Sequence, residues 1–261
     1  MSIFAKHNKI VIKVGTSTLT HGTGSLNLRR IECLSRVLSD IKNSGKQIIL
    51  VSSGAVSAGI AKSGLGHRPY SLEQQQAMAA IGQSELMKIF DRFFSDYGHT
   101  VSQILMTRDV IDMDNRRVAA QNTFNTLLSM GCVPIVNEND SVSTDELGKF
   151  GGNDILSAYV AKLVGADLLI ILSDIDGLFD ADPRVNSEAK LIRRVENIND
   201  YIACATENGA DCGTGGMKAK LDAARIVTES GIPMIITNGE NPEILYNILD
   251  GEELGTYFEE K

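Results

Sequence analysis

Short apolar runs alternate with segments of helical pattern along almost the whole chain. The apolar runs have the length of β-strands and fall at residues 10–14, 47–51, 101–106, 133–136, 168–172, 232–237 and 256–258. The segments between them predict helices at residues 28–43, 71–97, 115–130, 154–164 and 242–249, with a short helix after Gly54 and another that ends at Gly231. Such alternation predicts an α/β fold in which helices cover both faces of a mainly parallel sheet.

One segment, residues 141–150, departs from this pattern because it is polar and has no sustained helical period. It lies between two groups of chemically reactive residues, so we expect a loop or small hairpin over a functional site. The chain is long enough for one domain or two closely joined lobes. We expect an N-terminal lobe of about residues 1–170 and a C-terminal lobe of about residues 171–261 within a single domain.

The sequence GTGGMKAK at residues 213–220 joins a glycine turn to a predicted helix start and adds two lysines. The first N–H groups of a helix have no partner within the helix and carry the positive end of its dipole, so they bind anions. Glycines let a phosphate approach the backbone, although such an entrance is often only a tight turn. The spacing differs from the G-x-x-x-x-G-K-[ST] loop and does not indicate the common NTPase fold.

Polar residues also follow the predicted strands at their carboxyl ends, where open α/β sheets bind ligands. Lys13 lies inside the first apolar strand, and a buried lysine needs an anion or a carboxylate as its partner. The alternative is a lysine at the edge of the sheet with its charged group in solvent. The remaining strand exits and helix starts carry groups suited to ligands, or to simple caps and turns: Ser52, Ser53, Asn137, Glu138, Asn139, Asp140, Asn153, Asp154, Ser173, Asp174 and Asp176.

Composition narrows the classes of function. The 261 residues carry a formal net charge of −8, which argues against nonspecific nucleic-acid binding because that needs a basic surface. The apolar runs are far shorter than the roughly 20 residues of a membrane helix, and residues 1–10 have no signal-peptide core, so we expect a cytoplasmic protein without a membrane partner. The four cysteines and four histidines are dispersed, which predicts neither disulfides nor a protein-bound metal cluster.

Taken together and in this order, the motifs resemble the amino acid kinase family over essentially the whole chain. The resemblance rests on KVGTS at residues 13–17, SGA at 53–55, NEND at 137–140, ND at 153–154, the segment 174–184, and GTGGM at 213–217 with Lys220. It implies a three-layer αβα sandwich of the carbamate kinase-like type. It also implies ATP- and Mg²⁺-dependent phosphorylation of the side-chain carboxylate of L-glutamate, the first step of proline biosynthesis.

The resemblance implies roles for individual residues. Lys13 and Lys220 would be catalytic cations oriented by Asp154, and no general base is expected because the glutamate carboxylate is already ionised. Ser53, Asp140 and Asn153 would bind glutamate. ATP would be bound by Lys13, Ser173, Asp174, Thr214, Gly215, Gly216, Met217, Lys218, Ala219 and Lys220.

Some expectations stay open at this point. Many family members carry a C-terminal RNA-modification-like (PUA) domain, and we expect a short form without it. Lys218 stands where the family often has serine, and either contacts a phosphate or lies in solvent. The resemblance suggests a dimer or tetramer that proline inhibits through the glutamate site and the 141–150 loop.

Two other functions are alternatives. The nearest is a sister kinase acting on N-acetylglutamate, carbamate, aspartate or a nucleoside monophosphate, although the Asp140 carboxylate favours an acceptor with a free α-ammonium group. The other is a nucleotide-binding regulator without catalysis, which the presence of Lys13, Asp154 and Lys220 together disfavours.

Overall fold

The computed structural model describes residues 7–65, 71–142, 150–201 and 215–261. Within these residues, eight strands form one sheet in the order β3-β4-β2-β1-β5-β9-β10-β8. Their bounds are β1 Lys9–Val14, β2 Gln47–Ser52, β3 Val101–Met106, β4 Val133–Glu138, β5 Leu168–Ser173, β8 Arg194–Val195, β9 Met234–Asn238 and β10 Thr256–Phe258. The strands from β3 to β9 are parallel, and β10 runs antiparallel to β9. The short strands β6 (Leu178–Phe179) and β7 (Leu191–Ile192) pair separately.

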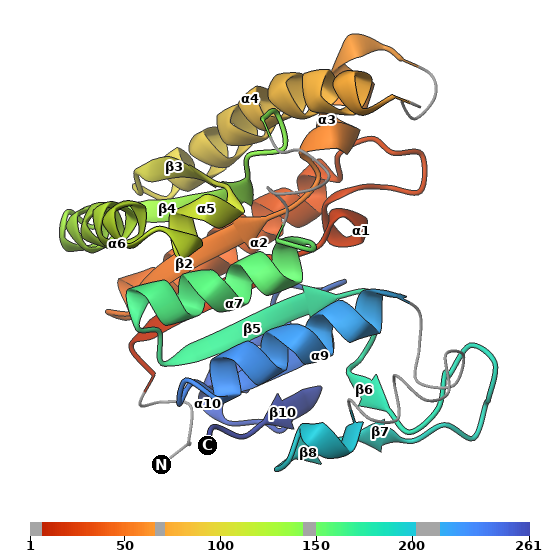
Figure 1. Ribbon diagram of the computed structural model, residues 1–261. Helices are drawn as coiled ribbons and strands as arrows, with labels where there is room; N and C mark the ends of the chain where they lie inside the picture. The colour runs from red at the N-terminus through yellow and green to blue at the C-terminus, as the bar shows by residue number, and fades with distance from the viewer. Residues whose placement is uncertain (1–6, 66–70, 143–149, 202–214) are drawn as a thin grey trace.

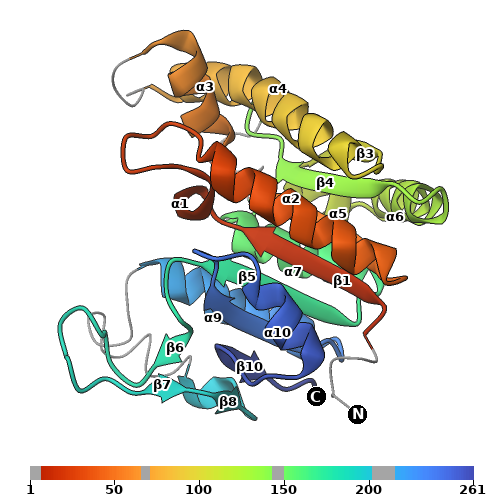
Figure 2. The ribbon, with the colours of Figure 1, turned by 180° about the vertical axis from the view of Figure 1, so that it is seen from behind.

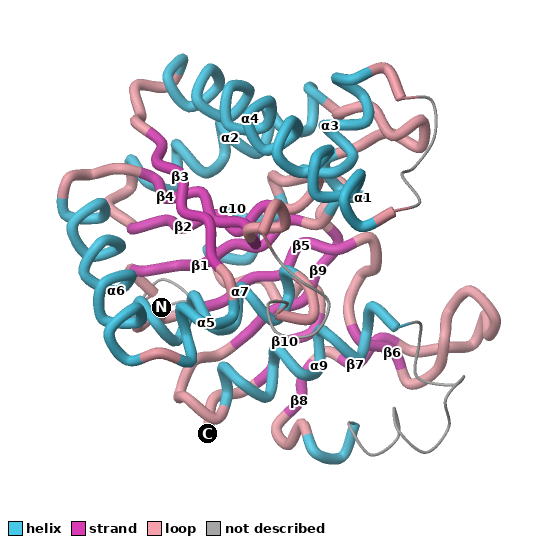
Figure 3. Tube along the Cα trace, turned by 45° about the horizontal axis from the view of Figure 1, so that its top comes forward, coloured by secondary structure: helices cyan, strands magenta, loops and turns pink. Residues whose placement is uncertain are grey.

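Helices cover both faces of the sheet (Figures 1 and 2). One face is covered by α6 (Asp114–Ser129), α7 (Asn153–Val164) and α9 (Gly215–Thr228). The other is covered by α2 (Leu28–Asn43), α3 (Ala55–Ser63), α4 (Leu72–Asp96) and α10 (Ile244–Asp250). Figure 3 shows the strands running between the two sets of helices, so the expected three-layer αβα sandwich is confirmed. No helix in the described part of the chain is both long and apolar enough to cross a membrane.

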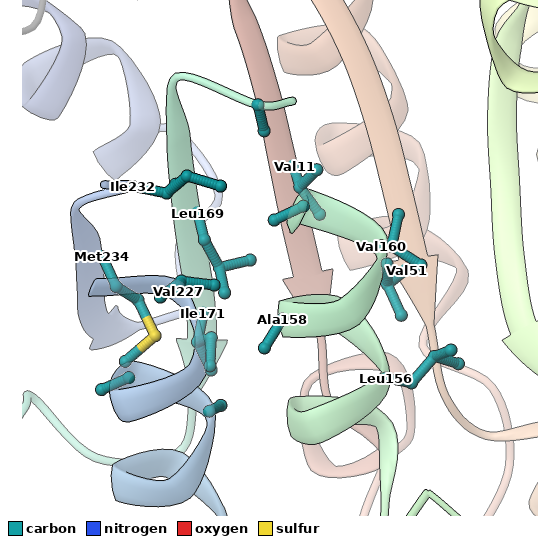
Figure 4. Packing of buried hydrophobic residues seen from close by; sticks show 14 of the residues in the cluster. Val11, Val51, Leu156, Ala158, Val160, Leu169, Ile171, Val227, Ile232 and Met234 are labelled. Atoms are coloured by element: carbon teal, nitrogen blue, oxygen red, sulfur yellow. The ribbon is translucent and has the colours of Figure 1, made fainter. Parts of the chain in front are cut away.

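The two faces of the sheet have separate apolar cores because successive residues of a strand point to opposite sides. In β1, Ile10, Ile12 and Val14 belong to the core beneath α2 and α4. Val11 belongs to the opposite core, where it packs with residues of α7, β5 and β9 (Figure 4). The same alternation places Lys13 on the α7 face.

Most of the predicted elements are present with nearly the predicted bounds. The helix predicted at 28–43 is α2, and the Ser71 side chain caps α4 by accepting a hydrogen bond from the Gln74 N–H (3.2 Å). The last core strand begins at Met234 and the last helix at Ile244, each two residues later than predicted, just beyond Pro233 and Pro242. The predicted loop at 141–150 falls largely on residues 143–149, which lie outside the described residues.

Short elements are what the pattern missed. These are the single turns α1 (Thr16–Leu19) and α5 (Arg108–Asp112) and the strands β6, β7 and β8. A segment of two to five residues is too short to show a hydrophobic period, so tertiary contacts define it.

The order of the strands changes direction between β1 and β5, at the centre of the sheet. Strands β1 to β4 lie on one side of this point, and β5 with β8 to β10 lies on the other. Ligands of open α/β sheets bind at such switch points, beyond the carboxyl ends of the strands. One sheet runs through both proposed lobes, and the boundary near residue 170 stays a prediction.

Helices α3 and α4 cross unusually closely, through Gly59 and Gly82. A Cβ atom on Gly82 would lie 1.7 Å from the carbonyl oxygen of Ala55, and one on Gly59 would lie 1.9 Å from that of Met78. Both neighbours are backbone atoms, which cannot move without shifting a helix. The crossing therefore fixes the position of α4 against the start of α3.

We expect Gly82→Ala to lower the free energy of unfolding by roughly 1–3 kcal/mol, because the added methyl group overpacks the crossing. Urea denaturation measures this change. Gly22→Ala is the matched control, since a Cβ atom on Gly22 would meet no heavy atom within 4 Å and the residue has no positive φ. Equal stability of the two variants would contradict the steric argument.

Candidate active site

Lys13 lies in the centre of the sheet, near the carboxyl end of β1. Its register neighbours are Val51 on β2 and Ile171 on β5, and the residue is only 7% exposed. The alternative of a lysine at the edge of the sheet is therefore wrong. A charged group in this position requires a buried partner.

That partner is Asp154, the second residue of α7. Lys13 Nζ lies 2.6 Å from Asp154 Oδ1, and Lys220 Nζ from the second turn of α9 lies 3.1 Å from Asp154 Oδ2. Lys220 Nζ also donates a hydrogen bond to the Gly216 carbonyl (3.4 Å). All three ionic side chains are buried, so one carboxylate joins the central strand to two helices.

The protonation of this cluster follows from its burial and its unequal charges. Burial lowers the pKa of Lys13, and the nearby Asp154 carboxylate opposes that effect. Burial by itself would raise the pKa of Asp154, but Lys13 and Lys220 outweigh it and hold that pKa below its ordinary value. Asp154 is therefore ionised at neutral pH. Because one carboxylate balances only one lysine, the cluster has positive charge to offer an anion.

A cavity of about 910 Å³ brings together the three residues predicted to bind glutamate, Ser53, Asp140 and Asn153. Asn153 Nδ2 donates hydrogen bonds to Ser53 Oγ (2.9 Å) and to the Ser52 carbonyl (3.0 Å). The next residue after Ser53, Gly54, has φ of +96°, a left-handed conformation that favours glycine and lets the chain turn from β2 into α3. Gly54 and Gly152 precede α3 and α7 and have no side chain to cap them, so among the described residues the first N–H groups of both helices can bind a ligand.

A second cavity, of about 170 Å³, holds part of the predicted ATP set: Asp174, Gly216, Met217 and Lys220. Its other wall is the segment from Ile175 to Arg184 that follows β5. Ser173 ends β5 and donates a hydrogen bond to Asp174 Oδ1 (3.1 Å).

The remaining predicted ATP residues divide into three groups. Gly215 begins α9, whereas Thr214 lies outside the described residues. Lys218 is exposed and Ala219 is half-buried. Lys13 is linked to Lys220, which lines the smaller cavity, because both lysines form ion pairs with Asp154.

The ionic cluster lies between the two cavities. Asn153 lines the larger cavity, the adjacent Asp154 binds both lysines, and Lys220 lines the smaller one. An anionic group that passes from one cavity to the other would meet the lysines on its way. This geometry suits the transfer of a phosphoryl group between two bound molecules.

Sequence reasoning gave several residues at the site no role of their own, although it placed two of them among the groups suited to ligands. Asn137 lines the larger cavity and accepts a hydrogen bond from Asn153 Nδ2 through its Oδ1 (2.8 Å). Glu138 Oε1 accepts one from the Phe150 N–H (3.1 Å). Both belong to the NEND motif at the end of a buried strand, and this position in the sequence indicates a residue near the ligand site. Gln83 on α4 carries no such signal, and it contacts Asn137 only because of the tertiary fold.

The fold and the site define an αβα protein with a cationic cluster between two cavities at the switch point of its sheet. The model of the amino acid kinase family matches residues 8–238. The glutamate 5-kinase of Clostridium perfringens is 54% identical over 96% of this chain and 94% of its own length, and that of Listeria monocytogenes serotype 4b is 51% identical over 97% and 93%. The chain therefore belongs to the amino acid kinase family and, within it, to the glutamate 5-kinases.

Solved structures confirm the fold at much lower sequence identity. UMP kinase from Bacillus anthracis has a TM-score of 0.68 at 19% identity, and the match covers 98% of this chain and 97% of that one. Carbamate kinase from Giardia lamblia, bound to AMP-PNP, has a TM-score of 0.68 at 15% identity and covers 98% and 100%. The expected carbamate kinase-like architecture is thus confirmed.

We expect Asp154→Asn to lower the free energy of unfolding by roughly 3–5 kcal/mol near neutral pH, because two buried lysines lose their shared carboxylate. The loss should shrink as pH rises through the pKa of Lys13, which burial lowers below its ordinary value, because the lysine then sheds its proton. It should also shrink in acid. The stabilisation by Asp154 is present above the ordinary carboxyl pKa of about 3.9 and disappears as pH falls through its lowered value.

Urea denaturation of both proteins across this pH range measures these differences. Asp112→Asn is the control, because the Asp112–Arg108 pair is exposed and should contribute no more than about 1 kcal/mol. A deficit in Asp154→Asn that does not change with pH would contradict the electrostatic explanation.

Proposed function

We propose that this protein transfers the γ-phosphoryl group of ATP to the side-chain carboxylate of L-glutamate, which gives L-glutamyl 5-phosphate and ADP in the first step of proline biosynthesis. The observation that carries the proposal is the buried cluster of Lys13, Asp154 and Lys220 between two cavities. Relatives named glutamate 5-kinase, 51–54% identical over nearly the whole chain, support the choice of acceptor.

In the proposed reaction, an oxygen of the glutamate carboxylate attacks the γ-phosphorus in line with the leaving ADP oxygen. This carboxylate is ionised at neutral pH, so no residue has to remove a proton from it. Catalysis then depends on placing the two substrates and on neutralising the charge of the transferring oxygens. Lys13 and Lys220 supply the positive charge, and Asp154 fixes where both ammonium groups lie.

Mg²⁺ would accompany ATP in this reaction. The described residues contain no group of three or more His, Cys, Asp or Glu side chains that could hold a metal ion. The donor set therefore suits a Mg²⁺ that is bound mainly through phosphate oxygens and water, as is usual for this ion. When bound, the ion would add positive charge to that supplied by the two lysines.

The larger cavity suits an amino acid with a free α-ammonium group, because the Asp140 carboxylate lines it. N-acetylglutamate has no such charge, because acetylation turns its α-ammonium group into a neutral amide, and it would leave the Asp140 carboxylate without a cationic partner from the substrate. Glutamate is therefore the preferred acceptor over its acetylated analogue.

The proposal extends to the cellular setting. The family resemblance supports a cytoplasmic homo-oligomer, dimer or tetramer, that proline inhibits by binding in the larger cavity. Light scattering of the purified protein tests the assembly. Glutamate titrations with and without proline test the inhibition, and an unchanged KM for glutamate in proline would contradict competition at this cavity.

We expect acyl phosphate to form when the protein is incubated with ATP, Mg²⁺ and glutamate, and to be trapped by hydroxylamine as a hydroxamate. N-acetylglutamate and aspartate in place of glutamate should give little product, because their charge or length does not fit the cavity. ADP release is measured in parallel. Product with N-acetylglutamate alone would favour a sister kinase, and ATP binding without ADP release would favour a regulator.

We expect Lys13→Met and Lys220→Met each to lower kcat by about 100-fold or more, since each removes a charge that contacts the transferring phosphoryl group. Lys162→Met is the control, because Lys162 is exposed near the end of α7, remote from the first turn of that helix. Circular dichroism verifies that the variants are folded. Normal turnover in a folded Lys13 or Lys220 variant would remove that lysine from the mechanism.

A further inference from the structure

Three side-chain amides from different elements form a continuous hydrogen-bonded chain that ends in the larger cavity. Asn137 Nδ2 on β4 donates to Gln83 Oε1 on α4 (2.9 Å). Asn153 Nδ2 on α7 donates to Asn137 Oδ1 (2.8 Å). Asn153 then reaches Ser53 Oγ and the Ser52 carbonyl at the end of β2. Gln83 itself lies outside this cavity and lines a neighbouring one of about 620 Å³.

Two backbone groups determine the direction of the whole chain. The Ser52 carbonyl can only accept a hydrogen bond, so the atom of Asn153 that faces it must be the NH₂ group. The Glu138 N–H can only donate, and it donates to the Asn137 side chain (2.9 Å), whose atom on that side must be the oxygen. The NH₂ group of Asn137 therefore points to Gln83, and Gln83 has to present its oxygen.

Gln83 reaches Asn137 because of the close crossing of α3 and α4. It follows Gly82, where any larger residue would collide with the Ala55 carbonyl. The crossing therefore holds Gln83 close to the start of α3, where Gly54 and Ala55 line the larger cavity. Gln83 is partly buried, and Asn137 is only 2% exposed.

The chain decides what Asn153 offers to a ligand. The two hydrogens of its NH₂ group are shared among three protein oxygens, and its Oδ1 has no partner among the described residues. Asn153 thus has a hydrogen-bond acceptor left for a molecule in the cavity. An acceptor there suits the α-ammonium group of an amino acid, together with the Asp140 carboxylate.

We propose that Gln83 is a positioning residue for the acceptor substrate, which acts through Asn137 on Asn153. This inference rests on the proposed function, because it assigns Gln83 to glutamate binding. Removal of the Gln83 oxygen leaves the buried NH₂ group of Asn137 without its acceptor. The Asn137 amide cannot turn over to compensate, since its NH₂ group would then face the Glu138 N–H and the NH₂ group of Asn153.

The test is a steady-state comparison of Gln83→Leu and Gln83→Glu. Leucine keeps the volume but not the acceptor, so KM for glutamate should rise about three- to tenfold, while kcat and KM for ATP change less than about twofold. Glutamate at position 83 still accepts from Asn137, so Gln83→Glu should stay within about twofold of wild type. Gln74→Leu is the control, because Gln74 lies on the same helix with an exposed side chain.

A second comparison uses the other end of the bond. In Asn137→Asp, the Gln83 amide can turn and donate its NH₂ group to the new carboxylate, so the contact between the two residues is kept. The charge added to the lining of the larger cavity should by itself raise KM for glutamate. In Gln83→Glu combined with Asn137→Asp, two acceptors face each other, and KM for glutamate should exceed the product of the two single effects. Multiplicative effects in this double-variant cycle would overturn the proposal.

Glutamate binding is measured independently of turnover by the thermal stabilisation of each folded variant in glutamate. A weaker stabilisation of Gln83→Leu than of wild type is expected. An unchanged KM and an unchanged stabilisation would overturn the role of Gln83, and so would an effect of Gln83→Glu as large as that of leucine. Failure of the wild-type protein to form acyl phosphate from glutamate would instead overturn the proposed function.

Discussion

The carboxylate of Asp154, shared by the ammonium groups of Lys13 and Lys220, is the interaction on which the arrangement of the site depends. A lysine in the middle of a buried parallel strand is unfavourable without a partner, and two lysines close together are more so. Asp154 satisfies both from one position at the start of α7. Because the three residues come from β1, α7 and α9, the ion pairs also hold the central strand and two helices in register.

The first turn of α7 joins the two halves of the site. Asp154 makes the ionic contacts toward the smaller cavity, and Asn153, one residue earlier, makes the amide contacts that border the larger one. Any movement of this turn would therefore alter both cavities together. For a reaction in which two anionic molecules must meet in line, such rigid coupling is an advantage, since catalysis depends on placement and charge more than on proton transfer.

The sequence predicted much of this from local signals. The strands and longer helices were recognisable because their hydrophobic periods extend over many residues, and the residues at strand exits were recognisable because polar groups follow apolar runs directly. It also predicted that a buried Lys13 needs an anion or a carboxylate as its partner, and Asp154 is that partner. The elements of two to five residues were missed, since no period can be read from them, and Lys218 could be assigned to solvent only from the exposure of its side chain.

The sequence by itself determined the αβα class, the family and the types of residue available for chemistry, because these follow from periodicity and from motifs contiguous in the chain. Only the tertiary structure decided that Lys13 lies on the central strand. It also decided that Asp154 binds both Lys13 and Lys220, which is 66 residues after Asp154 in the chain, and that Gln83 contacts Asn137, 54 residues later. The physical reason is that burial and hydrogen-bond direction depend on neighbours from distant elements. Those neighbours are supplied by the order of the strands, by the crossing of α3 and α4 at Gly59 and Gly82, and by the Ser52 carbonyl and the Glu138 N–H. None of these can be predicted from residues adjacent in sequence.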